Sequence, residues 1–273
     1  MILTATGFLT RIIGFFYRIF LSRTIGAKEI GLFQLLSPVN ALCAALCIGG
    51  VSTMMSRTIA AKTATKSKKD GFDILYLGTG FCLILSICAA LGLHHFSDFL
   101  AIRILGEKDL SPMVDILAYS IPLSTIHTCA MSYYFAQKKT GIPSIGQLLE
   151  QLVRVLSSYL VYQLMRNQGI QPDAQVAVIG LLAGEAAACL FTLIAVAWES
   201  SKHNYHFKIH AIPFSSASEL YRLSLPLTAN RICITLLHSV EAVLIPSRLQ
   251  MCGLTNDCLL YTSDAADDLI GVD

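Results

Sequence analysis

The sequence predicts an all-α, polytopic transmembrane helical bundle, and two observations support this prediction. The chain has 273 residues, of which 54% are hydrophobic and only 14% charged, whereas a soluble domain carries about 25% charged residues. The mean hydropathy is +0.61, and the apolar residues gather in stretches of about 20, the length that a helix needs to cross a bilayer. The net charge of +2 does not indicate a nucleic-acid partner.

About seven stretches qualify as transmembrane helices by length and composition. They cover residues 2–25, 31–61, 72–94, 113–135, 142–165, 174–198 and 223–245. The second is too long for one span, so we expect its helix to start near Phe33 and to extend into the cytoplasm past Arg57. Pro38, Pro122 and Pro226 lie in or near these helices and predict kinks.

The connecting segments alternate in basic charge, which predicts the topology. The loops on one side contain Lys62, Lys66, Lys68, Lys69, Lys138, Lys139, Lys202, Lys208 and Arg222, and those on the other only Lys28, Arg103, Lys108, Arg166 and Arg248. Cytoplasmic loops are enriched in Lys and Arg. We therefore place the first side and the N terminus in the cytoplasm, and the protein as a multi-pass component of the cell membrane. Residues 97–105 are typical of a short amphipathic helix on the outer surface.

The remaining polar segments give no metal or cofactor site. The cysteines lie mostly inside apolar stretches and lack the spacing of metal ligands, so we expect them to pack as small apolar residues. His203, His206 and His210 fall in the cytoplasmic segment 200–219, which is typical of an interfacial linker.

Ionisable residues within the predicted spans are the main functional signal, because each costs about 2.5–3.5 kcal/mol at a helix centre. Arg11 and Arg18 are two turns apart and share one face of the first helix. In the fifth helix, Gln147, Glu150, Gln151, Arg154 and Ser158 form a polar stripe, in which Glu150 and Arg154 have the spacing of an ion pair. The stripe lines either a water-filled cavity or a buried interhelical network.

Three further ionisable residues complete the candidate site. Glu185 lies in the middle of the sixth helix, and Arg231 and Glu241 lie in the seventh. Arginines match phosphate oxygens and stay charged, so the expected substrate-binding set is Arg11, Arg18, Gln147, Glu150, Arg154 and Arg231. Buried carboxylates carry protons or sodium ions in transporters, which makes Glu185 and Glu241 candidates for ion coupling.

Catalytic motifs are absent from the sequence. It contains no P-loop, no GxSxG and no HExxH pattern, so we expect no enzymatic activity and no cofactor.

The opening block GFLTRIIGFFYRIFLSRTIGAKEIGLFQLLSPV, at residues 7–39, resembles the start of polysaccharide-biosynthesis transporters of the stage V sporulation protein B type. The segments GGVSTMMSRTIAAK (49–62), QLLEQLVRV (147–155) and LIPSRLQMCGL (244–254) continue the resemblance. The family belongs to the multidrug/oligosaccharidyl-lipid/polysaccharide exporter superfamily, together with the lipid II flippases.

The resemblance implies a bundle of about fourteen helices in two lobes around a central cavity, with undecaprenyl-pyrophosphate-linked saccharides as substrates. Arg11 and Arg18 would correspond to cavity arginines of lipid II flippases. Residues 1–198 would form the first lobe, 199–222 a cytoplasmic linker and 223–257 the first helix of the second lobe. The expected function is a flippase for peptidoglycan or polysaccharide precursors, in contact with membrane lipids and with H⁺ or Na⁺ as a coupling ion.

Two other functions remain open at this point. A multidrug/cation antiporter of the same superfamily should have a site dominated by acids, whereas arginines match or outnumber them here. A membrane-embedded enzyme acting on lipid-linked glycans should show paired acids or a catalytic loop, and the outer segment 97–112 offers only Asp98, Glu107 and Asp109.

The last sixteen residues read CLLYTSDAADDLIGVD from Cys258 to Asp273 and resemble the translation of a transposon-end sequencing adapter. We therefore expect the native part of this sequence to reach about Asp257 and the native protein to continue beyond it, so that the chain is an N-terminal fragment. Residues 258–273 are left out of the fold prediction.

Overall fold

The computed structural model describes residues 2–65, 69–202, 222–238 and 240. All regular structure in these residues is helical, which confirms the predicted all-α class. Among the described residues, three helices contain segments that are long and apolar enough to cross a membrane: Lys28–Cys47, Gly71–His95 and Gln175–Lys202. The predictions for the linker histidines, for Glu241 and for the tail 258–273 concern residues outside the described part of the chain.

Most of the predicted helices appear close to their expected limits. In chain order they are α1 (Ile2–Thr24), α2 (Ala27–Cys47), α3 (Gly49–Thr65), α4 (Lys69–His95), α5 (Ser97–Phe99), the π-helix η1 (Leu100–Ile104), the 3₁₀-helix η2 (Lys108–Leu110), α6 (Ser111–Ala136), α7 (Gly141–Asn167) and α8 (Gln175–Lys202). Residues 222–238 are also helical.

The second apolar stretch differs from its prediction. Its helix begins at Ala27, several residues before Phe33, and is interrupted at Ile48 between α2 and α3. Two consecutive glycines, Gly49 and Gly50, follow the interruption, and glycine weakens a helix by about 1 kcal/mol relative to alanine. The Ser52 N–H still donates to the Ile48 carbonyl at 3.0 Å, so one hydrogen bond of helical spacing bridges the interruption.

The predicted surface helix at 97–105 is present as α5 and η1. Phe99 and Ile102 are 57% and 50% exposed, whereas Ala101 is buried. Phe99 and Ile102 therefore point away from the bundle and Ala101 packs against it, and the location of the segment at the outer membrane surface stays a prediction.

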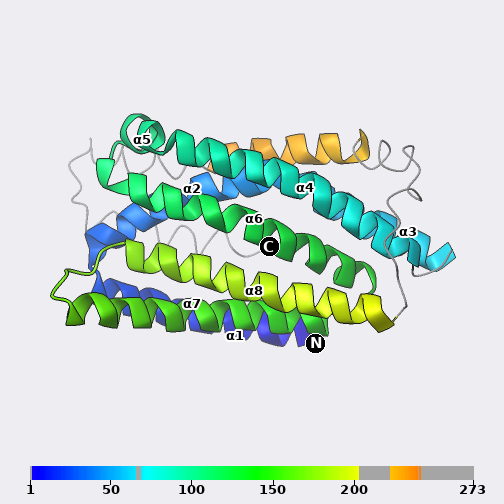
Figure 1. The fold of residues 1–273 in the computed structure, drawn as a ribbon, viewed down its shortest axis with the longest axis horizontal. Coiled ribbons are helices and arrows are strands. Elements are labelled where there is room, and N and C mark those ends of the chain that lie inside the picture. Colours follow the sequence, from blue (N-terminus) through cyan, green and yellow to red (C-terminus); the bar gives the residue numbers. More distant parts are fainter. Residues whose placement is uncertain (1, 66–68, 203–221, 239, 241–273) are drawn as a thin grey trace.

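The long helices lie side by side (Figure 1). Helix α8 packs between α6 and α7, α1 packs against the far side of α7, and α4 packs against α6. Helices α2 and α3 both contact α4 and α6. In Figure 1 the helix 222–238, drawn in orange, lies at the top of the view, and α1 and α7 form the lower edge.

Three apolar clusters hold this arrangement together. The first joins α2, α4 and α6 around Leu36, Val114 and Leu117. The second joins α3, α4 and α6 around Met55 and Tyr133. The third joins α1, α2, α7 and α8. The outward surface is also apolar over long stretches and includes the following exposed side chains: Phe8, Phe15, Phe16, Ile84, Leu91, Leu190, Ile194 and Trp198. Apolar surface of this extent fits contact with lipid.

Candidate functional site

The polar stripe of α7 forms the centre of the site. Arg154 donates through Nη2 to the Glu150 carboxylate one turn earlier, which confirms the ion pair predicted from their spacing. Arg154 Nη1 also lies 3.5 Å from Gln151 Oε1. The side chains of Arg154 and Glu150 are only 20% and 19% exposed. The pair is therefore mostly enclosed by neighbouring helices, and Gln147 at the start of the stripe is exposed.

Two glycines of α8 bring that helix against the stripe. An added Cβ at Gly184 would lie 2.9 Å from the Glu150 carbonyl oxygen and 3.2 Å from Arg154 Cβ, and one at Gly180 would lie 1.9 Å from Ser158 Oγ. Glycines four residues apart permit such close approach of membrane helices. Helix α8 therefore presents Glu185, directly after Gly184, to the ion pair of α7.

Glu185 completes the acidic part of the cluster. Its carboxylate interacts with Glu150 and Arg154 on α7 and with Ser124 on α6. One of its oxygens, Oε2, is buried and has no hydrogen-bond partner among the described residues. Two carboxylates therefore lie next to one guanidinium inside the helix bundle.

His127 is a fourth member of the cluster, which the sequence reasoning missed. It lies on α6, is 7% exposed, and interacts electrostatically with Glu150. Its ring carbon Cε1 would lie 3.5 Å from a Cβ at Gly146 of α7. The available signal was a lone imidazole in the middle of the apolar stretch 113–135.

Helix α1 packs against the stripe of α7 on the side away from α8. The Tyr17 hydroxyl donates to Ser158 Oγ at 2.8 Å, and Ser158 in turn donates to the Val176 carbonyl at 3.3 Å. A Cβ at Gly14 would lie 3.4 Å from Gln151 Nε2, so this turn of α1 rests on the stripe. We call the set Tyr17, His127, Glu150, Gln151, Arg154, Ser158 and Glu185 the polar seam.

The two arginines of α1 lie beside this seam. Arg11 precedes Gly14 by about one turn and Arg18 follows it by about one turn, so they flank the position where α1 meets Gln151. Both side chains are exposed. The structure therefore brings Arg11 and Arg18 to the edge of a buried, charged network to which Glu150, Arg154 and Glu185 contribute.

Arg231 lies elsewhere in the molecule. Its Cβ and Cδ would be 3.5 and 3.6 Å from a Cβ at Gly49, which places it against the α2–α3 break. The helix that carries it and the pair α1–α7 lie on opposite sides of the bundle (Figure 1). The structure thus does not bring Arg231 together with the other predicted arginines.

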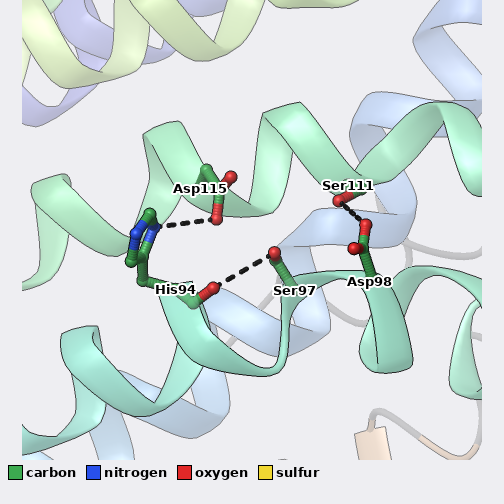
Figure 2. A network of polar contacts seen from close by, with 5 residues as sticks. All are labelled: His94, Ser97, Asp98, Ser111 and Asp115. Carbon is green, nitrogen blue, oxygen red and sulfur yellow. Dashed lines mark hydrogen bonds and ion pairs between the residues drawn. The ribbon is translucent and has the colours of Figure 1, made fainter.

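A second polar network joins one end of α4 to the start of α6 (Figure 2). His94 Nδ1 lies 3.2 Å from Asp115 Oδ1, Ser97 donates to the His94 carbonyl at 3.2 Å, and Ser111 donates to Asp98 at 2.5 Å. These bonds fix the turn between the two helices. Within the described residues, no group of three or more His, Cys, Asp or Glu side chains is arranged to hold a metal ion.

Comparison with known proteins adds a family and one curated relative. The chain matches the family described as "Polysaccharide biosynthesis protein" over residues 1–251. It is 25% identical over 258 residues to stage V sporulation protein B of Bacillus subtilis (strain 168), across 93% of this chain and 49% of that protein. The chain therefore spans about half the length of this relative. No solved structure matches it significantly.

Proposed function

Since the chain belongs to the polysaccharide biosynthesis protein family, we propose that it is the first half of a membrane flippase for undecaprenyl-pyrophosphate-linked saccharides. Residues 1–198 form its first lobe, 199–222 its cytoplasmic linker and 223–257 the first helix of its second lobe. The N terminus lies in the cytoplasm, and residues 258–273 are not native. The protein has no enzymatic role in this proposal.

The observation that carries the proposal is the exposed pair Arg11 and Arg18 at the edge of the polar seam. A guanidinium binds two phosphate oxygens at once and keeps its charge at any working pH. The pyrophosphate of the substrate binds to these two arginines, and the polyprenyl chain stays in the surrounding lipid. The enclosed charges of α7 and α8 hold the seam in place behind them, and Gln147 at its exposed end contacts the saccharide.

The three remaining candidates have different roles in this proposal. Arg231 lies against Gly49 and reaches the substrate only when the lobes rearrange, as alternating access requires. Glu185 and Glu241 carry a coupling ion, either H⁺ or Na⁺. An antiporter for organic cations is less well supported, because the exposed charges beside the seam are arginines, which would repel a cationic substrate.

Substitution of the two arginines tests the proposal. In the complete transporter, Arg11→Ala and Arg18→Ala should each abolish complementation of a flippase-deficient strain at unchanged expression. Loss of one charge-assisted hydrogen bond removes about 1.5–3 kcal/mol, roughly a 10- to 100-fold loss of affinity. Arg23→Ala on the same helix is the matched control and should complement fully. Full complementation by both Arg11→Ala and Arg18→Ala would exclude the phosphate-binding role.

A further inference from the structure

Three polar atoms of the seam are buried without a hydrogen-bond partner in the part of the chain that the structure describes. They are His127 Nδ1 on α6, Arg154 Nε on α7 and Glu185 Oε2 on α8. Unpaired buried polar atoms are rare, because each costs about 1–3 kcal/mol. Here they occur on three helices that pack against one another, around a single group of interacting charges. The cluster therefore has free donor and acceptor positions that a bound partner would satisfy.

The charges of the cluster indicate whether a bound partner would be positive or negative. Glu150 and Glu185 carry two negative charges and Arg154 one positive charge, so the cluster is negative by one when His127 is neutral. The groups that face it from the other packed elements do not balance this charge: α6 adds Ser124, and α1 adds Tyr17. Arg11 and Arg18 of α1 are exposed at the edge. An enclosed net charge is unfavourable at low dielectric, so the site should take up a cation.

We propose that His127, Glu150, Arg154 and Glu185 form a proton-binding site inside the first lobe, with Glu185 as the group that takes up and releases the proton. A hard metal cation would need several oxygen ligands, whereas two of the three unpaired atoms are nitrogens and one belongs to a guanidinium, which has only donors. A proton needs no such shell. Bound to Glu185 Oε2, it neutralises the cluster and converts that oxygen from an acceptor into a donor.

The same arrangement links the proton to the substrate, a step that rests on the proposed function. With Glu185 protonated, Arg154 pairs with Glu150 alone. With Glu185 ionised, two carboxylates compete for the same guanidinium. Arg154 also contacts Gln151, which lies against Gly14 between Arg11 and Arg18. Proton release therefore changes the surroundings of the residues that hold the pyrophosphate.

Infrared difference spectroscopy of the complete chain in lipid nanodiscs tests the site without transport. Protonated carboxyl groups have a carbonyl band that ionised ones lack. We expect one such band to disappear in Glu185→Gln and to persist in Glu107→Gln, the control at an exposed acid. Arg154→Gln should move its titration midpoint upward by about one pH unit or more, because an adjacent opposite charge shifts titration by about 1–3 units. Glu185→Asp, which keeps the carboxyl group, should retain the band if Glu185→Gln alters folding.

The outcomes separate this proposal from the proposed function. If every carboxyl band persists in Glu185→Gln, Glu185 holds no proton and the proposal fails. If the band disappears in Glu185→Gln but keeps its titration midpoint in Arg154→Gln, Glu185 titrates independently of Arg154 and the four-residue site is excluded. If the site titrates as expected but Arg11→Ala and Arg18→Ala complement fully, the proton site stands and the flippase proposal fails. If Glu185→Gln complements at every external pH while the arginine variants do not, the flippase proposal stands without coupling at Glu185.

Discussion

At the residue scale, Gly184 decides how closely α7 and α8 approach. Its missing side chain leaves room for the Glu150 carbonyl oxygen, which would lie 2.9 Å from a Cβ. Gly184→Ala should therefore force the two helices apart and lower the free energy of unfolding by about 1–3 kcal/mol, the usual effect of overpacking. The measurement is thermal unfolding in detergent.

The control for this substitution is Gly80→Ala in α4. Nothing lies within 4 Å of a Cβ at Gly80, so alanine should leave stability unchanged or raise it by up to about 1 kcal/mol. Equal unfolding midpoints for Gly184→Ala and Gly80→Ala would contradict the close contact of α7 with α8.

Asp173 provides a pH-dependent prediction in the loop before α8. Burial raises the pKa of Asp173, the Gln175 N–H that it accepts lowers it, and nearby Glu29 raises it again. Since the pKa is higher folded than unfolded, the associated stability is complete below the unfolded value of about 4 and is lost as pH rises through the folded value.

Asp173→Asn should remove this pH dependence, because asparagine still caps the helix but does not ionise. Between about pH 4 and pH 7, the wild-type unfolding midpoint should fall relative to that of Asp173→Asn. Thermal unfolding of both proteins across this range is the measurement. Parallel curves would show that Asp173 titrates alike in the folded and unfolded chain.

Some residues of the site could be predicted from the sequence and others could not. The spacing of Glu150 and Arg154 predicts their ion pair, because residues four apart on a helix are always neighbours. The sequence did not identify His127 as part of the site. Its contacts come from α7, and the sequence does not show that α7 packs against the middle of α6. Arg231 was grouped with the other arginines on chemistry alone, and only the contact with Gly49 shows that they are apart.

At the scale of elements, a close helix crossing lies at the α2–α3 break. The Gly50 N–H donates to Thr228 Oγ1 at 3.1 Å, and a Cβ at Gly50 would lie only 2.3 Å from the Ser224 carbonyl oxygen. The apolar stretch 31–61 predicts a helix but not this break, because the contact comes from a distant segment. Gly50 thus has a packing role that its local sequence does not reveal.

Gly50→Ala should release the helix 222–238 from this position. Gly49→Ala is the matched neighbour, since its Cβ meets only the Arg231 side chain at 3.5 Å or more, an ordinary contact. Spin labels on the exposed Cys88 and Cys233, with Cys252 and Cys258 replaced by serine, report the position of the helix. We expect a broadened distance distribution in Gly50→Ala and a wild-type distribution in Gly49→Ala. Identical distributions in both would mean that the contact does not hold the helix.

At the scale of the whole molecule, composition predicts the helical membrane class and the motifs predict the family, and both are confirmed. The packing order α1–α7–α8–α6–α4 was not predictable. Helices that are apolar on every side do not encode which face meets a neighbour, because lipid and protein are equally apolar surroundings. Only helices with a polar stripe, such as α7, reveal a buried side in the sequence.

The orientation of the bundle in the membrane can be tested at the two ends of α8. The distribution of basic loops places the segment before α8 outside the cell and its C-terminal end inside. Its 28 residues span about 42 Å at 1.5 Å per residue, enough to cross a bilayer. With Cys88, Cys233, Cys252 and Cys258 replaced by serine, Gln171→Cys should react with a membrane-impermeant maleimide in intact cells. Ser201→Cys should react only after permeabilisation. Both positions are exposed, so a reversed pattern would invert the topology, and labelling of both in intact cells would show that α8 does not span the membrane.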